Sequence, residues 1–264
     1  MAEESINPEH LSSKGAVNVV CLKWGEVYSP EYVNNLYSMV KRHLSYPFRF
    51  ICFTENSTGI RTEVEIQPLP EFEEPPWEYA RYCQAWRKLA LFKSGLANMQ
   101  GKVLFLDLDV VIMDSIDELF SFSSKLAIIE NWYQPGQLVG QASAFCFEAG
   151  QAETLLNHYL EDPMRVLDSY RTEQAYITGF LGKQGFDFFP EGWCISFKKH
   201  CMPSGIARFF SAKVTEPKQA KIVVFHGRPN PPDAIKGIWG KALPWYKRWY
   251  KRVQPTPWIA KHWC

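Results

Sequence analysis

The sequence predicts a single α/β domain in which helices flank a mostly parallel β-sheet, followed by a basic, aromatic C-terminal tail. Short continuous apolar runs, typical of buried parallel strands, alternate with segments of helical periodicity. The chain has 264 residues and is 46% hydrophobic, which is enough for one large core. After Asp233 no acidic residue follows. We therefore expect a flexible N-terminus at residues 1–15, the domain at 16–235 and the tail at 236–264.

The first three elements form a βαβ unit. The apolar run Val17–Leu22 predicts the first strand. Residues Ser29–Leu44 predict a helix, because Ser29 can cap it, Pro30 suits its first turn and apolar residues follow at three-and-four spacing. Phe48–Phe53 predicts the second strand, which ends at a polar segment.

The next elements lead to two acidic residues. A proline-rich acidic loop at Pro68–Pro76 precedes a predicted helix at Tyr79–Leu96. Gly101 introduces a strand at Val103–Leu106, and a further apolar stretch follows at Val110–Met113. Between these two apolar runs lies Asp-Leu-Asp, which places two carboxylates at the end of a strand.

The rest of the domain continues the alternation. We expect strands at Leu126–Ile129, Ala142–Phe147 and Ile222–Phe225, and helices at Gln151–Leu160 and Glu173–Phe180. Such an order favours a sheet covered by helices.

Composition limits the classes of function. Lys and Arg number 29 against 28 Asp and Glu, so no global positive field favours nucleic acid. Seven cysteines lie far apart without a Cys-x-x-Cys unit, and several, such as Cys21 and Cys52, lie in apolar strands. These features indicate reduced thiols and a cytoplasmic protein. The N-terminal residues lack a secretory signal, and no apolar stretch is long enough to span a bilayer.

The pair Asp107 and Asp109 is the strongest candidate for chemistry. In a regular strand the two would share a face, and a turn at the strand's end could aim both at one cation. Hard oxygen ligands suit Mg²⁺ or Mn²⁺, which also bind phosphate oxygens. The alternative is that both residues cap the loop before Asp114.

The run VLFLDLDVVI, Val103–Ile112, resembles the nucleotide-sugar glycosyltransferases of the GT-A fold, whose hallmark is Asp-x-Asp after an apolar strand. The similarity is to the group that includes glycogenin and the lipopolysaccharide galactosyltransferases. It implies a Rossmann-like sheet and metal-dependent transfer of a hexose from a nucleotide diphosphate sugar. A UDP-sugar donor and a retaining reaction follow from the resemblance alone.

A second motif, FHGRPNP at Phe225–Pro231, is similar to the group's later His-containing motif. The resemblance implies that His226 is a third metal ligand beside Asp107 and Asp109. It also implies that Gly227 lets the backbone approach the diphosphate and that Arg228 offsets its charge. The full motif His-x-x-Gly-x-x-Lys-Pro-Trp is not matched. A structural histidine is the alternative for His226.

Further donor contacts are implied by position. Trp24 and Gly25 follow the first strand, and Thr54 and Glu55 follow the second, where open α/β sheets bind ligands. Ordinary turn chemistry also explains these residue types. Leu108, inside the Asp-x-Asp motif, is assigned to the donor site as well.

Basic residues before the Asp-x-Asp strand are donor candidates too. Arg81 and Lys88 lie seven residues apart in RYCQAWRK, so one helical face can present both. A solvated helix face is the alternative reading.

Candidate catalytic residues come from the second half of the domain. Glu173 and Gln174 resemble an acidic-Gln pair near the transferred sugar. In an inverting enzyme Glu173 or Asp187 would deprotonate the acceptor, and in a retaining one Gln174 or a carboxylate would support the oxocarbenium-like state. The alternative is a helix start at the surface.

The tail suggests where the acceptor lies. Trp and Tyr alternate with Lys and Arg from Lys236 to Trp263, which suits the inner face of a membrane. We expect a glycan or lipid-linked acceptor in surface polysaccharide or glycolipid synthesis. The alternative is that the aromatic rings pack on the sheet while the basic groups stay solvated.

Two other functions remain open. A nucleotide-sugar nucleotidyltransferase would also use metal-bound carboxylates, but no glycine-rich, basic loop follows the first strand. A non-catalytic carbohydrate-binding protein is compatible with the aromatic content of 15%.

Overall fold

The computed structural model describes residues 16–73, 75, 83–240 and 243–264. They form two compact units. The seven-stranded unit contains residues 16–29, 46–107 and 117–189 within these limits, and the three-stranded unit contains residues 30–45, 108–116 and 190–264.

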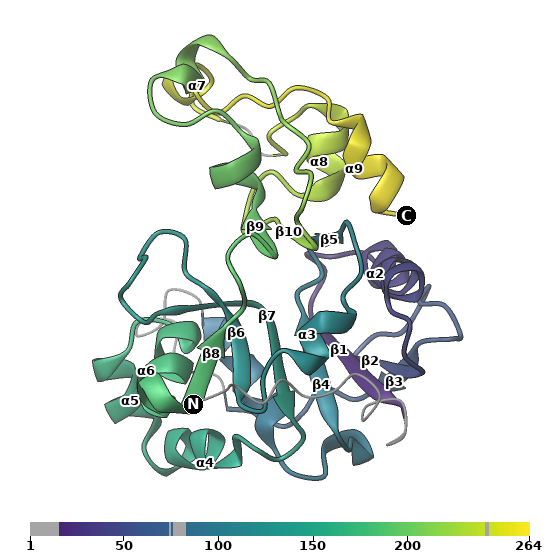
Figure 1. Cartoon of the computed structure of the whole chain (residues 1–264), viewed down its shortest axis with the longest axis vertical. Coiled ribbons are helices and arrows are strands. Elements are labelled where there is room, and N and C mark those ends of the chain that lie inside the picture. Colours follow the sequence, from purple (N-terminus) through teal and green to yellow (C-terminus); the bar gives the residue numbers. More distant parts are fainter. Residues whose placement is uncertain (1–15, 74, 76–82, 241–242) are drawn as a thin grey trace. The chain divides into compact units, whose positions relative to one another are not determined.

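The seven-stranded unit is built on one mixed sheet with the strand order β3-β2-β1-β4-β7-β6-β8 (Figure 1). Its strands are β1 (Val17–Lys23), β2 (Phe48–Thr54), β3 (Glu65–Gln67), β4 (Lys102–Leu106), β6 (Leu126–Glu130), β7 (Gly140–Glu148) and β8 (Phe186–Phe188). Strands β1 and β4 are buried along their whole length, as expected for apolar runs covered on both faces.

The prediction of a mostly parallel sheet is confirmed. Strand β1 pairs in parallel with both β2 and β4, and Lys23 lies opposite Thr54, so β1 and β2 end at the same edge. Strand β7 is antiparallel to β4 and to β6. The physical reason is that β6 leads directly into β7 through residues 131–139, without the helical crossover that parallel neighbours need.

Helices of this unit pack against the sheet around an aromatic core. They are the 3-10 helices η1 (Cys83–Phe92) and η2 (Leu96–Asn98), and α3 (Asp117–Ser121), α4 (Glu153–Glu161), α5 (Pro163–Ser169) and α6 (Glu173–Gly185). The rings of Trp86 and Tyr159 stack 5.4 Å apart, and those of Trp86 and Tyr176 5.8 Å apart. These contacts join η1, α4 and α6 on the sheet.

The segment predicted as a regular helix at Tyr79–Leu96 differs from that prediction. Its described part forms the 3-10 helix η1, and residues 79–82 lie outside the described residues. Trp86, Leu89 and Phe92 are all fully buried. Their spacing of three matches the three residues per turn of a 3-10 helix, so this winding turns all three toward the core.

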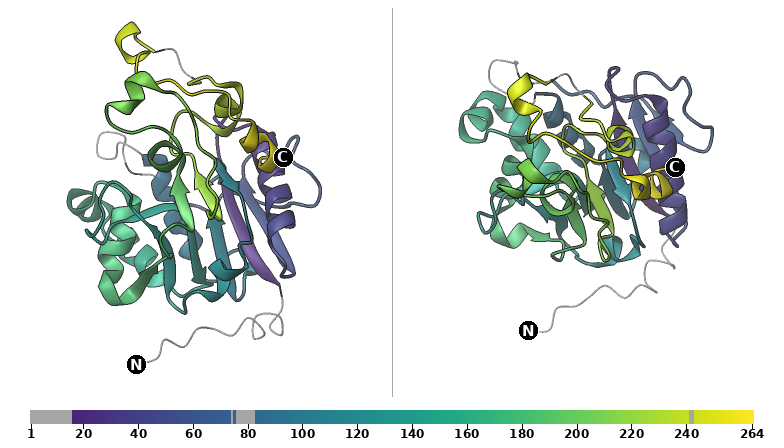
Figure 2. Two further views of the ribbon diagram at one scale, coloured as in Figure 1. Left: turned by 45° about the horizontal axis from the view of Figure 1, so that its top comes forward. Right: turned by 90° about the horizontal axis from the view of Figure 1, so that it is seen from above.

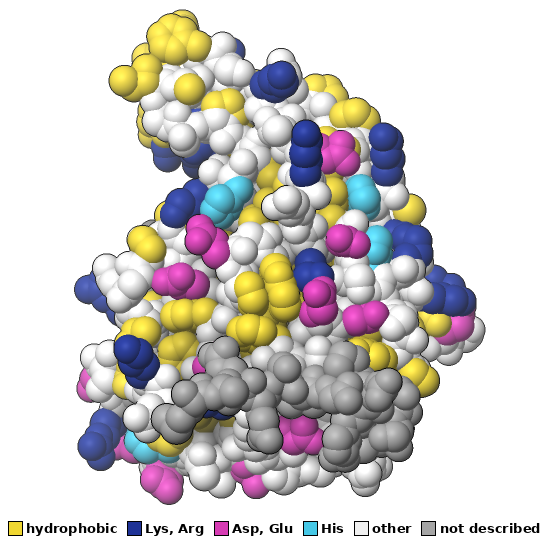
Figure 3. Space-filling model, viewed as in Figure 1, with side chains coloured by type: hydrophobic (Ala, Val, Ile, Leu, Met, Phe, Trp, Pro, Cys, Tyr) yellow, Lys and Arg dark blue, Asp and Glu magenta, His cyan; other side chains and the backbone are white. Residues whose placement is uncertain are grey.

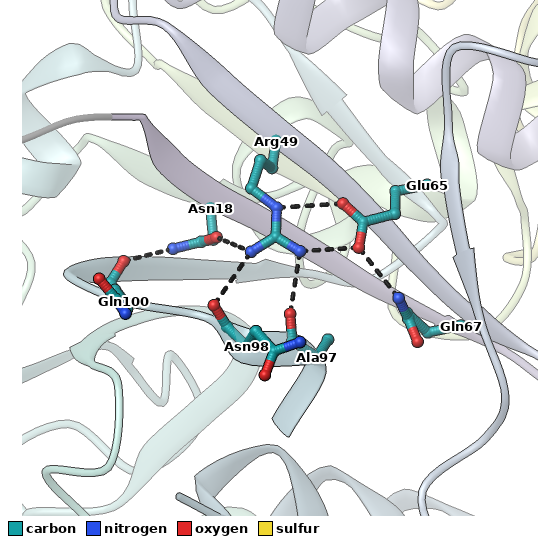
Figure 4. A network of polar contacts seen from close by, with 7 residues as sticks. All are labelled: Asn18, Arg49, Glu65, Gln67, Ala97, Asn98 and Gln100. Carbon is teal, nitrogen blue, oxygen red and sulfur yellow. Dashed lines mark hydrogen bonds and ion pairs between the residues drawn. The ribbon is translucent and has the colours of Figure 1, made fainter. Parts of the chain in front are cut away.

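A polar network ties the beginnings of β1, β2 and β3 to the loop before β4 (Figure 4). Arg49 forms a two-pronged ion pair with Glu65, at 2.7 and 3.0 Å. The same guanidinium donates to the carbonyls of Ala97 and Asn98, at 2.9 and 3.3 Å. Both of these residues have positive φ, so Arg49 secures a turn of unfavourable backbone conformation.

The three-stranded unit has the strand order β5-β10-β9. Its elements are α2 (Pro30–His43), β5 (Val110–Ile112), β9 (Cys194–Ser196), the π-helix η3 (Phe197–Cys201), α7 (Ala207–Phe210), β10 (Ile222–Val224), α8 (Pro231–Lys236), η4 (Trp245–Lys247) and α9 (Pro257–His262). Strand β10 is antiparallel to β5 and parallel to β9. The helix predicted at Ser29–Leu44 is confirmed as α2, which packs on β5.

The aromatic residues of the tail fall into two groups. Trp258 and Trp263 are each 6% exposed and pack in the three-stranded unit, against Phe197 and Tyr32 respectively. Trp245 and Trp249 are 76% and 66% exposed. The packing alternative therefore holds for α9 but not for the residues around η4. None of the described helices combines the length and apolarity needed to cross a bilayer.

We predict that Arg49→Lys lowers the free energy of unfolding by about 1–2 kcal/mol, because a lysine cannot reproduce the two-pronged pair and the carbonyl contacts. Chemical denaturation measures this change. Arg61→Lys is the matched control, since Arg61 pairs with the more exposed Glu63 two residues away, and it should change stability by less than about 0.5 kcal/mol. Equal losses in both variants would contradict the structural role of the Arg49 network.

Candidate functional site

The Asp-x-Asp motif lies in the turn between β4 and β5. Asp107 directly follows β4, and its N–H donates to the carbonyl of Ser143 on β7 at 2.8 Å. Asp109 directly precedes β5 and is 6% exposed, and its carbonyl accepts from the N–H of Phe225 at 3.1 Å. Leu108 between them is buried. Asp107 belongs to the seven-stranded unit and Asp109 to the three-stranded unit.

In the seven-stranded unit Lys88 is paired with Asp107. Its Nζ lies 2.8 Å from Asp107 Oδ1 and 3.0 Å from Oδ2, and it donates to the carbonyl of Ala142 at 2.9 Å. The Lys88 side chain is 7% exposed, so its ammonium is largely desolvated and needs these partners to compensate its charge. The solvated-face alternative for Lys88 is therefore wrong.

Glu173 and Gln174, at the start of α6, complete this cluster. Glu173 is 5% exposed, and burial raises the pKa of its carboxyl, although Lys88 nearby acts in the opposite direction. Gln174 Oε1 accepts from the N–H of Ala142 at 3.3 Å. The structure thus gathers Lys88, Asp107, Glu173 and Gln174 where β4 ends beside β7, and the surface-helix alternative is wrong for Glu173.

The loops after β1 and β2 meet at the edge where the two strands end. Gly25 donates its N–H to Glu55 Oε1 at 2.6 Å. Its φ of 57° lies in the left-handed region that favours glycine. Thr54 is buried, and its hydroxyl accepts a hydrogen bond from the N–H of Asn56 at 3.1 Å, which is the pattern of an ST-turn. Trp24 is half-buried and packs against the core.

Two predicted residues lie elsewhere. Arg81 is outside the described residues. Asp187 lies on β8, opposite Ala127 of β6, and contacts Ser123 Oγ at 2.6 Å and Lys125 Nζ at 3.3 Å. The structure therefore does not bring Asp187 into the Lys88–Asp107–Glu173 cluster, and its catalytic role stays a prediction.

In the three-stranded unit all three strands deliver polar groups to one edge. Val110 of β5 lies opposite Val224 of β10, which lies beside Ser196 of β9. Because β5 runs antiparallel, Asp109 at its beginning and His226 just after β10 come to the same edge. Ser196 Oγ lies 2.6 Å from His226 Nε2.

His226 is surrounded by basic groups. Burial lowers the pKa of its imidazole to about 4, and Lys198 and His200 contribute in the same direction. The ring is therefore neutral near pH 7, which is the state that binds metals. Lys198 Nζ donates to the His226 carbonyl. Burial lowers the Lys198 pKa to about 8, whereas Asp109 acts to raise it.

Residues 227 and 228 differ in what they offer. Gly227 is exposed with a φ of 70°, and a β-carbon there would come within 3.8 Å of Lys198 Nζ. Arg228 pairs with Asp233 Oδ2 at 2.7 Å. Asp233 belongs to the capping box of α8, so the guanidinium is held at the start of that helix.

The residues predicted as metal ligands are two carboxylates, Asp107 and Asp109, and the neutral imidazole of His226, residue types that suit Mn²⁺ or Mg²⁺. Within the described part of the chain, no three His, Cys, Asp or Glu side chains form a group that could hold a metal ion. The residue types suit the predicted metal, but the structure does not gather these three side chains into one metal-binding group, so the ligand assignment stays a prediction.

Comparison with solved structures decides the fold. The galactosyltransferase LgtC, in a complex with donor and acceptor sugar analogs, superposes with a TM-score of 0.57 and 13% identity. The match covers 88% of this chain and 99% of that one. An active-site mutant of LgtC superposes over the same shares with a TM-score of 0.55 and 13% identity. The chain has the GT-A fold.

The predicted GT-A fold and its likeness to a lipopolysaccharide galactosyltransferase are thus confirmed in structure. No family model matches the sequence, and no curated protein sequence matches it significantly. At 13% identity the similarity concerns the fold alone.

Two residues of the three-stranded unit were missed by sequence reasoning. Ser196 and Lys198 lie about thirty residues before His226, and no spacing rule connects them to it. The sequence feature that could have pointed to Ser196 and Lys198 is the short strand Cys194–Ser196 followed closely by two lysines.

We predict that Glu173→Gln changes how stability depends on pH. Burial raises the folded-state pKa of Glu173 above the unfolded value of 4.5. The wild type should therefore lose stability as pH rises from 4.5 through the folded-state pKa, with a slope of at most about 1.4 kcal/mol per pH unit. The variant lacks this loss, so its relative stability should rise over the same window.

Urea unfolding between pH 4.5 and 8, with chelator present, measures this difference. Glu191→Gln, at an exposed carboxylate, is the control and should track the wild type. If Glu173→Gln instead becomes relatively less stable as pH rises, the attraction of Lys88 outweighs burial and the assignment is wrong.

Proposed function

We propose that this protein is a metal-dependent glycosyltransferase that moves a hexose from a nucleotide diphosphate sugar, with UDP as the favoured nucleotide, to a glycan or lipid-linked acceptor. The observation that carries the proposal is the cluster at the end of β4 in which the buried Lys88 and Glu173 meet the partly exposed Asp107. Carboxylates at a strand's end are placed where open α/β sheets bind ligands.

We propose Asp109 and His226 as ligands of Mn²⁺ or Mg²⁺, with Asp107, two residues away along the chain, as the third. The support is that β5 and β10 bring Asp109 and His226 to one edge and that His226 is neutral. When bound, a divalent cation would neutralise charge on the diphosphate oxygens. Ser196 would orient His226 through its contact with Nε2.

Donor binding would draw on two loop regions. Trp24, Gly25, Thr54 and Glu55 lie at the ends of β1 and β2, the position suited to the nucleoside. Gly227 is exposed and lacks a side chain, so its backbone is open to a phosphate.

The cation for the leaving diphosphate would come from Lys198. The ammonium lies beside the His226 carbonyl and close to Gly227, whereas Arg228 is paired with Asp233. Charge develops on the diphosphate as it leaves, so a fixed positive group there stabilises the transition state more than the bound donor.

Glu173 and Gln174 would act on the sugar side. Burial raises the pKa of the Glu173 carboxyl, which makes it a stronger base for the acceptor hydroxyl in an inverting reaction. In a retaining reaction the Gln174 amide would support the oxocarbenium-like state, and we favour retention because of the family resemblance. Lys88 would hold Asp107 and the local charge balance in place.

The free cysteines support a cytoplasmic location for the protein. Among the described residues Cys21, Cys52, Cys146, Cys194, Cys201 and Cys264 are all free, and five of the six are buried. Reduced cysteines are the rule in that compartment. A cytoplasmic enzyme of this kind would use nucleotide sugars made there and serve surface polysaccharide or glycolipid synthesis.

The experiment is donor turnover in the absence of acceptor, measured as release of nucleoside diphosphate from a panel of nucleotide sugars. We expect Mn²⁺-dependent hydrolysis of one donor, abolished by chelator. Lys198→Met should lower kcat/KM for that donor by roughly 10-fold to 1000-fold, as loss of one charge-stabilising group does in other sites.

Lys199→Met is the matched control, because Lys199 is the exposed neighbour of Lys198 and should leave turnover within about twofold. Release of pyrophosphate from a nucleoside triphosphate and sugar phosphate would instead identify a nucleotidyltransferase. Absence of turnover with every donor in folded protein would favour a non-catalytic binding protein.

A further inference from the structure

We propose that the three-stranded unit carries a docking surface for an anionic lipid bilayer, formed by the loop around α7 together with residues 245–252. This surface joins the tail to a segment about 40 residues earlier in the chain. The proposal does not depend on sugar transfer.

The surface begins with exposed hydrophobic side chains from both segments. Ile206 and Phe210 in the α7 region are 76% and 83% exposed, and Trp245 and Trp249 are 76% and 66% exposed. Single exposed apolar residues are ordinary, but a group of them indicates an interaction site. Figure 3 shows hydrophobic side chains over the region of α7, with basic ones beside them.

The two segments hold each other in place. Phe209 and Tyr250 have ring centroids 5.8 Å apart. Arg252 donates to the Phe209 carbonyl at 2.7 Å, and the N–H of Gln254 donates to the Ala212 carbonyl at 3.1 Å. Figures 1 and 2 show α7 close to the chain that contains η4. These contacts make one surface from two distant parts of the sequence.

The charge of the surface selects the partner. Residues 203–213 and 243–254 contain no Asp or Glu. Their basic residues are Arg208, Lys213, Lys247, Arg248, Lys251 and Arg252. A positive surface with protruding aromatic rings matches a bilayer interface, where anionic head groups lie above a region that accepts apolar side chains.

A pocket beside the hydrophobic residues has the chemistry for a head-group phosphate. It measures about 370 Å³, and Trp239, Arg248, Lys251 and Arg252 contribute to its lining. Lys251 Nζ lies 5.5 Å from the centre of the Trp239 ring. Three basic side chains around one pocket favour a phosphate group, and the exposed rings beside them favour a phosphate that belongs to a lipid.

Sedimentation of the full-length protein with phosphatidylcholine vesicles, with and without phosphatidylglycerol, tests the surface. We expect binding that requires phosphatidylglycerol and weakens as salt is added. Phe210→Ser combined with Trp249→Ser should weaken binding roughly tenfold or more, because the rings no longer enter the interface. Arg248→Gln combined with Lys251→Gln should weaken it by a similar factor and flatten its salt dependence.

Matched controls come from exposed positions of the seven-stranded unit. Leu160→Ser removes an apolar side chain that is 52% exposed, and Lys93→Gln with Lys183→Gln removes two exposed charges. These variants should bind vesicles within about twofold of the wild type. Circular dichroism confirms that every variant is folded.

Three results would overturn the proposal: a wild type that stays in the supernatant with phosphatidylglycerol vesicles, surface variants that bind as the controls do, or a soluble polyanion that binds as tightly as vesicles and with no dependence on Phe210 or Trp249. Loss of vesicle binding with donor hydrolysis intact would support the surface and leave the transferase proposal untouched. Vesicle binding by a protein without donor turnover would support the docking surface and count against the transferase proposal.

Discussion

The seven-stranded unit depends on the pairing of Lys88 with Asp107, which organises the edge where β4 ends beside β7. A lysine that is almost fully buried must be compensated, and Asp107 supplies both carboxylate oxygens within 3.0 Å. The same ammonium binds the Ala142 carbonyl, while Gln174 binds the Ala142 N–H. One cation therefore joins η1, β4, β7 and the start of α6. Glu173, whose pKa is raised chiefly by burial, brings a second carboxyl to this cluster.

The three-stranded unit also gathers its polar residues at one edge of a sheet. Its sheet has only three short strands, yet their directions bring the beginning of β5 and the ends of β9 and β10 to one edge. Asp109, Ser196 and His226 lie at that edge, and Lys198 follows in η3. Burial, with a smaller contribution from Lys198 and His200, lowers the pKa of His226 and keeps its ring neutral. A small sheet thus presents a carboxylate, an imidazole and an ammonium at one edge.

The sequence predicts the sheet well because the signal for a buried strand is local. Val17–Leu22 and Phe48–Phe53 are apolar runs interrupted only by Asn18 and Arg49, Val103–Leu106 is wholly apolar, and each becomes a strand within one residue of the expected length. The direction of β7 is harder to predict, because it depends on the connection at residues 131–139, which carries no strong hairpin signal. The winding of η1 follows the spacing of three between Trp86, Leu89 and Phe92, which is also compatible with an ordinary helix.

Site prediction is harder where a contact is distant or where a second role competes. Arg228 is expected to offset charge on the diphosphate, and the structure pairs it with Asp233, the carboxylate that also caps α8, so its donor role stays a prediction. The position of Lys198 beside His226 had no local signal, because it arises from the pairing of β9 with β10. For the docking surface, the sequence predicts the contribution of the tail, whereas the contribution of α7 follows only from the fold.

The most direct test of the central claim is calorimetric titration of nucleoside diphosphates into metal-loaded protein, comparing the wild type with Asp109→Asn and with Asp114→Asn. Asp114 is an exposed aspartate five residues further along and serves as the matched control. The account predicts that one nucleotide binds the wild type and the control in the presence of Mn²⁺, and that folded Asp109→Asn binds it far more weakly. Binding that is unchanged in Asp109→Asn, or absent from folded wild type, would contradict the account.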